Sequence, residues 1–152
     1  MITISLCMIV KNEEKVLARC LDSIADLMDE IIIVDTGSSD NTKEIAKKYT
    51  DKIYDFAWID DFSAARNYSF SKATKEYIYV ADADEVIDAD NHRKLAELKE
   101  VLIPEIEIVQ MRYCNQLANG TAYNFDEEYR PKLYKRQREF TWIEPVHEMD
   151  RL

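Results

Sequence analysis

Glycine and proline are scarce in this chain: 2 glycines and 3 prolines stand among 152 residues. These residues mark turns and flexible linkers, so their scarcity argues against linkers and low-complexity segments. No internal repeat is visible either. A chain of this length can bury a sizeable core, and we expect one domain over residues 1–152. The chain stops soon after a cluster of candidate functional residues, which also fits a fragment of a longer protein.

Long apolar runs and an excess of basic residues are missing as well. No apolar run approaches the roughly 20 residues of a membrane-spanning helix, and the N-terminus lacks the basic region and cleavage site of a signal peptide. The formal net charge of −10 argues against nucleic acid or an anionic membrane surface as a partner. We therefore expect a cytoplasmic protein in which a metal or local basic residues hold any anionic ligand.

Cysteine is limited to 3 residues, an odd number without CxxC spacing. Neither a disulfide framework nor a zinc site is indicated. Cys7 lies in an apolar segment of strand type, and Cys20 lies on the apolar face of an expected helix. We expect both in the core rather than as nucleophiles, and the pattern fits a reducing compartment.

The first half of the chain alternates between buried strands and helices. Four apolar, β-prone segments are expected to form strands, at residues 3–10, 30–35, 52–58 and 77–81. Helical patterns separate them: one after Asn12 as N-cap, one after a capping box of Asn41 and Glu44, and one over residues 63–73. This order predicts right-handed crossovers and a Rossmann-like α/β fold, a mostly parallel sheet with helices on both faces.

The second half has a different pattern. Residues 93–102 show helical spacing, with leucines on one face. A long β-hairpin is expected to turn at Asn119-Gly120, and the segments KLYKR and FTWI are expected to be further short strands. The C-terminal part of the sheet is therefore expected to be antiparallel.

Polar residues follow the four expected strands at their carboxyl ends, where open parallel sheets bind ligands. The segments there are VKN, DTGSSD, DDFSAARN and DADE. Together they predict one cleft, lined by Asp35, Asp60, Asp61, Arg66, Asp82 and Asp84. Hard carboxylate oxygens suit Mg²⁺ or Mn²⁺, and a divalent cation would relieve the repulsion between Asp82 and Asp84.

Each of these motifs also has a plainer interpretation. D-x-D can simply start a turn, and Asp60-Asp61 can be a turn and helix cap. The loop DTGSSDNT could cradle a phosphate, but it lacks P-loop spacing, and an ordinary capped turn is equally compatible. An EF-hand starting at Asp82 is excluded, because Ile87 and Arg93 occupy the positions that need glycine and an acid.

Four stretches in the same order resemble family 2 glycosyltransferases with the GT-A fold, of the bacterial type: MIVKNEEKVLARCLDSI, DEIIIVDTGSSDNTKEIAKKY, FAWIDDFSAARNYSFSKATKEYIYVADADE and WIEPVHE. The resemblance covers nearly the whole chain, residues 3–148. It implies a nucleotide-diphosphate-sugar donor, usually a UDP-sugar, and inversion at the anomeric carbon. The chain is shorter than the usual catalytic region of the family, which leaves part of the acceptor site unaccounted for.

The resemblance implies a role for each residue of the donor site. Asp35 matches the acid that contacts the nucleobase, and Arg66 resembles a basic residue near the base or ribose. Asp82 matches the first acid of the D-x-D motif, near the ribose or the metal. Asp84 matches the last acid, a ligand of Mn²⁺ or Mg²⁺ at the diphosphate. The backbone of Ile9, Val10 and Lys11 is expected to flank the base, and Gly37 is a further candidate for donor binding.

The resemblance also implies how the transfer occurs. The metal neutralises charge on the leaving diphosphate, and an acidic general base deprotonates the acceptor hydroxyl for in-line attack. Glu148 and, second, Glu144 are the candidates for this base. His147 is a candidate ligand of the metal or of the diphosphate, although a lone histidine is equally compatible with a surface or packed role.

Two other functions stay open on the sequence. A nucleotidyltransferase shares the two-carboxylate metal chemistry, but its usual glycine- and arginine-rich loop is missing after the first strand. A GT-A-like module could bind nucleotide or glycan without turnover. For an enzyme, the expected acceptor is a glycan, a protein or a lipid-linked intermediate, the last with peripheral association at the inner membrane face. Aromatic residues of the hairpin could stack on the acceptor, although aromatic strand residues more often pack inside the protein. These residues are Tyr113, Tyr123, Phe125 and Tyr129.

Overall fold

The computed structural model describes residues 1–58, 61–102, 105–116, 122–136, 140–142 and 149–151, with side chains over 1–58, 61–102, 105–109 and 132–136. Its strands are β1 (Ile4–Val10), β2 (Glu30–Asp35), β3 (Ile53–Asp55), β4 (Tyr77–Val80), β5 (Ile108–Gln116), β6 (Ala122–Lys135), β7 (Phe140–Trp142) and β8 (Met149–Arg151). Its helices are α1 (Leu17–Ile24), the 3-10 turn η1 (Ala25–Leu27), α2 (Thr42–Ala46), α3 (Phe62–Lys72) and α4 (Ala89–Val101). None of these helices is long and apolar enough to cross a membrane.

Six of the described strands form one mixed sheet in the order β3-β2-β1-β4-β6-β5. β1 is parallel to both β2 and β4, and β2 is parallel to β3. β6 is antiparallel to β4, and β5 is antiparallel to β6. A separate pair, β7 and β8, is also antiparallel. The expected α/β fold, with a mostly parallel sheet and an antiparallel C-terminal part, is therefore confirmed.

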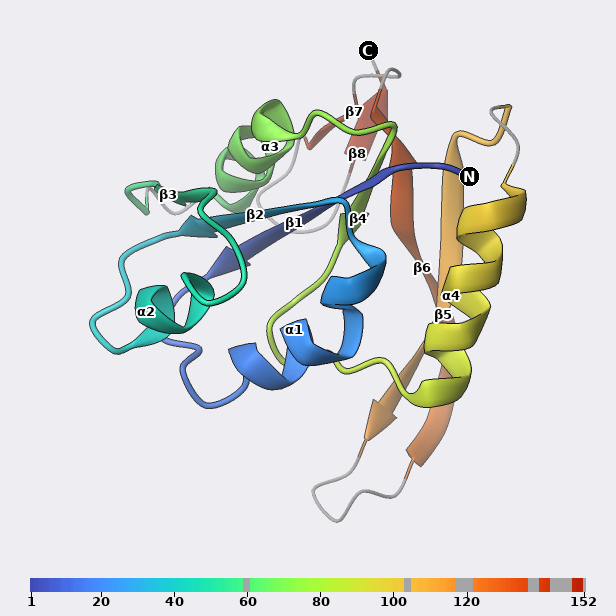
Figure 1. Ribbon diagram of the computed structural model, residues 1–152, viewed down its shortest axis with the longest axis horizontal. Coiled ribbons are helices and arrows are strands. Elements are labelled where there is room, and N and C mark those ends of the chain that lie inside the picture. The colour runs from blue at the N-terminus through green and yellow to red at the C-terminus, as the bar shows by residue number, and fades with distance from the viewer. Residues whose placement is uncertain (59–60, 103–104, 117–121, 137–139, 143–148, 152) are drawn as a thin grey trace.

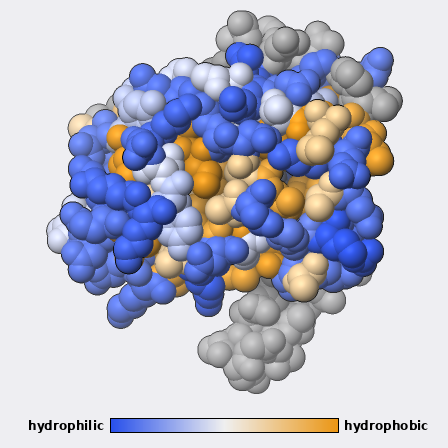
Figure 2. Space-filling model, viewed as in Figure 1, coloured by the Kyte–Doolittle hydropathy of each residue, from blue (hydrophilic) through white to orange (hydrophobic). Residues whose placement is uncertain are grey.

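Helices cover both faces of the sheet (Figure 1). α1, α2 and α4 lie on one face and α3 lies on the other. Side chains of β1 alternate between the two cores: Leu6 and Met8 join the first, and Cys7 joins the second. Because both faces are covered, β1 and β2 are nearly continuous apolar runs, as in buried parallel sheets. Apolar residues show between the hydrophilic outer surfaces on the face seen in Figure 2.

Cys7 and Cys20 are core residues, as expected. Cys7 is fully buried in the core on the α3 face, and Cys20 is buried on α1. Burial raises the pKa of both thiols to about 12. A buried thiol with so high a pKa stays protonated and is a poor nucleophile, so neither cysteine is a candidate for catalysis.

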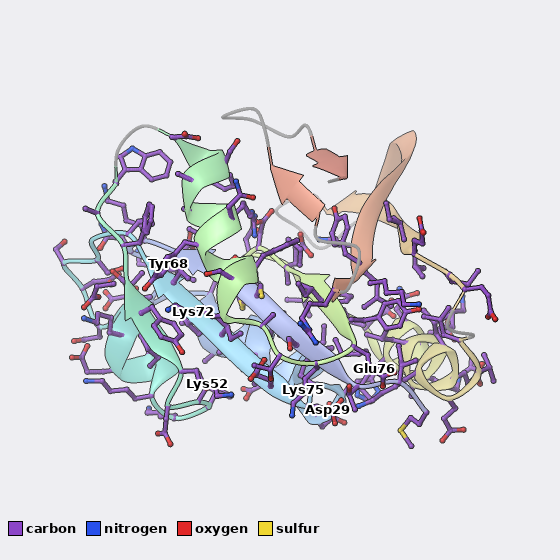
Figure 3. All side chains as sticks on the ribbon, turned by 90° about the horizontal axis from the view of Figure 1, so that it is seen from above. Asp29, Lys52, Tyr68, Lys72, Lys75 and Glu76 are labelled. Carbon is purple, nitrogen blue, oxygen red and sulfur yellow. The ribbon has the colours of Figure 1, made fainter. Side chains whose placement is uncertain are left out.

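α3 packs against β3, the edge strand of the sheet, through aromatic rings and one lysine. The amino group of Lys72 lies 5.0 Å from the ring centroids of Tyr54 and of Tyr68. Tyr68 and Lys72 are labelled on α3 in Figure 3. Such cation–π contacts hold α3 across β3, the short edge strand that carries Tyr54.

The first helix begins later than the sequence suggests. α1 begins at Leu17 after Val16, and no side-chain hydrogen bond caps it. Asn12, the expected N-cap, has a left-handed backbone with φ of +53°. The prediction for Asn12 is therefore wrong, because this residue belongs to a turn between β1 and α1.

The capping box expected at α2 is also wrong. Asn41 precedes the helix but makes no side-chain capping bond, so its spacing from Glu44 is not used. Asp40 takes over this task and accepts hydrogen bonds from the amide and the hydroxyl of Thr42. The cap is thus shifted by one residue from the position that local spacing favours.

Other boundaries differ modestly from expectation. α3 agrees with the expected 63–73 within one residue at each end, whereas β3 is shorter than the expected 52–58. α4 begins at Ala89 rather than at residue 93, because Asp88 caps it by accepting from the Asn91 amide. The segment KLYKR is not a separate strand, since β6 runs through Lys135. The hairpin of β5 and β6 is present, and its expected turn at 119–120 lies outside the described residues.

The amino end of β2 carries a buried carboxylate, Glu30, which is 5% exposed. It accepts hydrogen bonds from the Ser5 hydroxyl at 2.7 Å and from the Thr74 amide and hydroxyl, each at 2.9 Å. Lys52, labelled in Figure 3, completes the set with an ion pair. Burial by itself would raise the pKa of Glu30, but the bonds from Lys52, Ser5 and Thr74 outweigh it and lower the pKa to about 2. Glu30 therefore ties β1, β2 and the segment before β4 together.

We expect Glu30→Ala to lower the free energy of unfolding by about 3 kcal/mol, because it leaves the Ser5 hydroxyl and the Thr74 amide without their acceptor. Urea denaturation measures the change. Glu97→Ala is the matched control: Glu97 pairs with Arg93 on the surface of α4, and its loss should cost about 0.5 kcal/mol or less. Equal losses in the two variants would contradict a structural role for Glu30.

We expect the stabilising effect of Glu30 to depend on pH. Its pKa falls from an ordinary 4.5 to about 2 on folding, so the ionised form stabilises the fold above about pH 4.5, and this contribution is lost as the pH falls through 2. The difference in unfolding free energy between the wild type and Glu30→Gln should be largest near neutral pH and shrink toward pH 2. A difference that stays constant over this range would disprove the link.

Candidate functional site

The carboxyl ends of β1, β2 and β4 lie on one edge of the sheet, because the three strands are parallel. Val10 at the end of β1 pairs with Asp35 at the end of β2, and Cys7 of β1 pairs with Val80 at the end of β4. Open parallel sheets bind ligands at this edge. The polar residues that follow these strands therefore gather on one side of the molecule, as the sequence predicts.

Asp35 is buried at this edge, with 2% of its surface exposed. Its Oδ1 accepts hydrogen bonds from the amides of Gly37 at 2.9 Å and Ser38 at 2.8 Å, so the loop turns around the carboxylate. Its Oδ2 is buried and has no hydrogen-bond partner within the described part of the chain. Because an unpaired buried carboxylate oxygen is costly, this atom is suited to accept a hydrogen bond from a ligand.

Arg66 reaches this edge from α3, on the other face of the sheet. Arg66 is 5% exposed, and its Nη2 donates to Asp82 Oδ1 at 2.9 Å. Its guanidinium also lies 5.0 Å from the ring centroid of Phe62. A buried cation thus holds one oxygen of an acid whose side chain is 53% exposed. The structure brings together two residues that the sequence assigns to one cleft.

The turn after β4 presents Asp82 and Asp84, both exposed. The Glu85 amide donates to the Asp82 carbonyl at 3.0 Å, which closes the turn. From α1, the Cys20 thiol contacts the same carbonyl at 3.6 Å, and Arg19 donates to the Asp84 carbonyl at 3.4 Å. These contacts support the backbone of the turn, and both side chains are exposed, with one oxygen of Asp82 bound to Arg66.

Glu85 is not part of this exposed pair. Its carboxylate accepts from the Lys132 amino group at 2.5 and 2.6 Å, and both side chains are largely buried, at 17% and 12% exposed. Lys132 comes from β6, so this ion pair fastens the acidic turn to the antiparallel part of the sheet. The three acids of DADE therefore divide into two that are exposed and one that anchors the turn.

Glu13 is a further carboxylate at this edge that sequence reasoning missed as a site residue. Burial raises its pKa, and the negative charges of Asp84, Asp82 and Asp40 raise it further. Besides burial, this shift reflects the negative charges that follow β1, β2 and β4. The position of Glu13 directly after the first strand, in VKNEE, is the signal that could have identified it.

The carboxylate oxygens at this edge of the sheet fit a divalent metal in part. Asp82 and Asp84 offer hard oxygen ligands, and the negative charges that surround Glu13 favour a cation there. Among the described residues, however, no group of three or more His, Cys, Asp or Glu is arranged to hold a metal ion alone. A metal at this turn would therefore take further ligands, such as phosphate oxygens or water.

The loop between β2 and α2 is not an open phosphate cradle. The amides of residues 37, 38, 39, 41 and 42 already donate to side-chain oxygens of Asp35, Asn12, Glu14 and Asp40. Gly37 has a left-handed φ of +116°, and a Cβ added there would meet nothing within 4 Å. The loop is an ordinary capped turn whose glycine leaves open space beside it.

The remaining candidate residues have different surroundings. Ile9 is half-buried and paired with Val34 in the sheet, and the Val10 carbonyl accepts from the Thr36 amide at 3.0 Å. Lys11 is exposed. The candidates outside the described residues are Asp60, Glu144, His147 and Glu148, and the side chains not described include those of Tyr113, Tyr123, Phe125 and Tyr129.

A hollow of about 410 Å³ lies at the opposite edge, beside the amino end of β2. Three of the polar side chains that line it are used within the protein. Tyr49 donates its hydroxyl to Asp22 at 2.6 Å, Thr50 donates to the Ile31 carbonyl at 2.7 Å, and Glu30 holds the contacts described above. The hollow is remote from the acidic turn and is not part of the candidate site.

Comparison with known proteins gives a consistent family. The family model described as glycosyl transferase family 2 matches residues 5–149. The chain is 51% identical over 85 residues to a TPR repeat-containing protein of Synechococcus elongatus, which is 56% of this chain and 21% of that protein. It is 41% identical over 102 residues to the SPbeta prophage-derived glycosyltransferase SunS of Bacillus subtilis, which is 66% of this chain and 24% of that protein. The chain thus spans about a quarter or less of the length of these relatives.

The fold is shared with a solved enzyme. Glucosyl-3-phosphoglycerate synthase from Mycobacterium tuberculosis, in complex with UDP, matches with a TM-score of 0.64 and 18% identity, over 90% of this chain and 57% of that chain. The same enzyme in complex with Mn²⁺ and UDP-glucose matches with a TM-score of 0.57 and 23% identity, over 72% and 43%. At these identities the likeness concerns the fold.

Asp61 caps α3 by accepting a hydrogen bond from the Ala64 amide at 3.2 Å, which favours the plainer interpretation of this residue. We expect Asp61→Ala to lower the free energy of unfolding by about 1 kcal/mol, and Asp61→Ser, which keeps a capping oxygen, to stay close to the wild type. Urea denaturation of the two variants measures both values. Wild-type stability in Asp61→Ala would contradict the capping role.

Proposed function

Because this chain belongs to glycosyltransferase family 2, we propose that it is an inverting glycosyltransferase that moves a sugar from a nucleotide-diphosphate donor, a UDP-sugar, to an acceptor hydroxyl. The observation that carries this proposal is Asp35 Oδ2, a buried oxygen without a partner in the described part of the chain. It lies on the sheet edge that also carries Asp82 and Asp84. A nucleotide would use both features, with its base at Asp35 and its diphosphate at the acidic turn.

The base of the donor would be recognised by Asp35. Uracil carries an N–H between its two carbonyl groups, and a carboxylate oxygen can accept this proton in a charge-assisted hydrogen bond. The backbone of Ile9, Val10 and Lys11 would flank the ring, and the open space beside Gly37 lets a ligand approach the loop closely. The complex of the Mycobacterium tuberculosis synthase with UDP supports uridine as the nucleoside.

The diphosphate would lie at Asp82 and Asp84. These residues would hold Mn²⁺ or Mg²⁺ together with phosphate oxygens, with His147 as a further candidate ligand. The ion would supply the positive charge that offsets charge on the leaving diphosphate. Arg66 keeps one oxygen of Asp82 in place, so Asp82 meets the ligand with a fixed orientation. The complex of the related synthase with Mn²⁺ and UDP-glucose supports this assignment.

The acceptor hydroxyl would be deprotonated by an acid from the C-terminal segment, Glu148 or, second, Glu144. Attack from the face opposite the nucleotide then inverts the configuration at the anomeric carbon. The new glycosidic bond forms as the bond to the diphosphate breaks, and the acceptor proton passes to the carboxylate. The acceptor belongs to the proposal as a class: a glycan, a lipid-linked intermediate or a protein.

We expect UDP to bind only weakly without Mn²⁺, and Asp84→Asn to lower the affinity for UDP in the presence of Mn²⁺ by about tenfold or more. Calorimetric titration measures both effects. Asp88→Asn is the matched control, because it removes the same charge from the same loop while asparagine still caps α4. Its affinity for UDP should equal that of the wild type.

Three outcomes would overturn parts of this proposal. Metal-independent binding of UDP would remove the role of Asp84 and leave a nucleotide site. Binding of UDP without Mn²⁺-dependent hydrolysis or transfer from any UDP-sugar would indicate a binding module rather than an enzyme. No binding of UDP, GDP or dTDP to the wild type would overturn the donor site itself.

A further inference from the structure

At the edge of the sheet where β1, β2 and β4 end, two loops are joined by reciprocal hydrogen bonds. The loop after β1 carries Asn12, and the loop after β2 carries Ser38 and Ser39. The Asn12 amide donates to the Ser38 hydroxyl at 2.9 Å, and the Ser39 amide donates to Asn12 Oδ1 at 2.8 Å. The Ser39 hydroxyl also lies 3.4 Å from the same Asn12 oxygen. One residue thus binds the opposite loop through both its backbone and its side chain.

The backbone of Asn12 is held in a conformation that favours this exchange. Within the described part of the chain, Asn12 is the non-glycine residue with a positive φ, which is +53°. Asparagine tolerates this left-handed region better than most residues. With this backbone, both the amide and the side-chain oxygen of Asn12 bond to the same loop.

A second exchange lies beside the first. The Asn41 amide donates to Glu14 Oε2 at 2.9 Å, and the Glu13 amide donates to the Thr42 hydroxyl at 2.8 Å. The Glu14 amide in turn approaches Asp40 Oδ2 at 3.4 Å. Backbone amides on each loop are therefore bound by side chains of the other. This reciprocal pattern stiffens both loops without regular secondary structure.

Ser38 connects this arrangement to Asp35. The Ser38 hydroxyl accepts from Asn12, while the Ser38 amide donates to Asp35 Oδ1 at 2.8 Å. The Gly37 amide donates to the same oxygen at 2.9 Å. The loop that Asn12 holds is therefore the loop that fixes the carboxylate of Asp35. The orientation of the buried Oδ2 depends on where this loop stands.

We propose that Asn12 is a positioning residue for nucleobase recognition: through Ser38 and Ser39 it fixes the loop that aims Asp35 Oδ2 at the base. Asn12 itself need not touch the ligand. This inference rests on the proposed function, and it assigns Asn12 to the selection of the base rather than to the diphosphate. The neighbouring exchange at Glu14 supports the same loop from its other end.

The choice between UDP and CDP tests this role, because the two ligands share ribose and diphosphate. Uracil offers an N–H donor where cytosine has an acceptor nitrogen, so a fixed Asp35 Oδ2 should favour UDP by about tenfold or more. Asn12→Gly keeps the left-handed backbone but removes the side-chain oxygen, and should reduce this preference several-fold. Asn12→Asp keeps the acceptor and should retain the preference of the wild type. Calorimetric titration with Mn²⁺ measures all affinities.

Tyr49→Phe is the matched control, because it removes a hydrogen bond of 2.6 Å to Asp22 of α1 without touching the two loops. Its preference for UDP over CDP should equal that of the wild type, even if its melting temperature falls. Should Asn12→Gly fail to fold, Ser38→Ala removes the acceptor of the Asn12 amide and carries the same expectation.

The outcomes separate this inference from the proposed function. A wild type that binds neither UDP nor CDP overturns the proposed function. A wild type that binds both equally leaves a nucleotide site but overturns base selection by Asp35 and the role of Asn12. An unchanged preference in a folded Asn12→Gly variant, with UDP favoured by the wild type, overturns the inference alone.

Discussion

The parallel pairing of β1 with β2 and β4 is the constraint on which the rest of this structure depends. Parallel strands need crossover connections, and here the crossovers are helices that bury both faces of the sheet. The same pairing directs the carboxyl ends of the three strands to one edge. Residues as distant in the chain as Asp35 and Asp82 come to the same edge for this reason alone. The location of the candidate site therefore follows from the topology of the sheet and does not depend on any single side-chain contact.

The two acidic residues at the ends of β2 differ in how their carboxylates are hydrogen-bonded. At the amino end, Glu30 is buried and fully engaged with Ser5, Lys52 and Thr74, so its charge serves the fold. At the carboxyl end, Asp35 keeps one buried oxygen without a partner in the described part of the chain. Because leaving such an atom unpaired costs stability, its presence at the edge where open parallel sheets bind ligands fits recognition better than folding.

The acidic turn after β4 shows how a chain with a formal net charge of −10 can keep carboxylates close together. Arg66 reaches Asp82 from the opposite face of the sheet, and Lys132 binds Glu85 from the antiparallel part. Each partner offsets one negative charge of the turn, and under the proposed function Asp84 and the second oxygen of Asp82 would meet the ligand. The turn is therefore supported by two cations that lie far from it in the sequence, and a divalent ion would add to this balance rather than create it.

The sequence by itself determined the order of strands and helices, the helices on both faces of the sheet, and the edge at which Asp35, Asp82 and Asp84 lie. Apolar runs and helical spacing are local signals, so they predict elements to within a few residues. Only the tertiary structure decided the partners of the polar residues. Asn12 and Asn41 look like helix caps in the sequence, yet Asn12 bonds to the opposite loop through its amide and its side-chain oxygen, and Asn41 through its amide, with partners 26 or 27 residues away. A polar side chain takes the partner that is nearest in space, and spacing along the chain cannot reveal which partner that is.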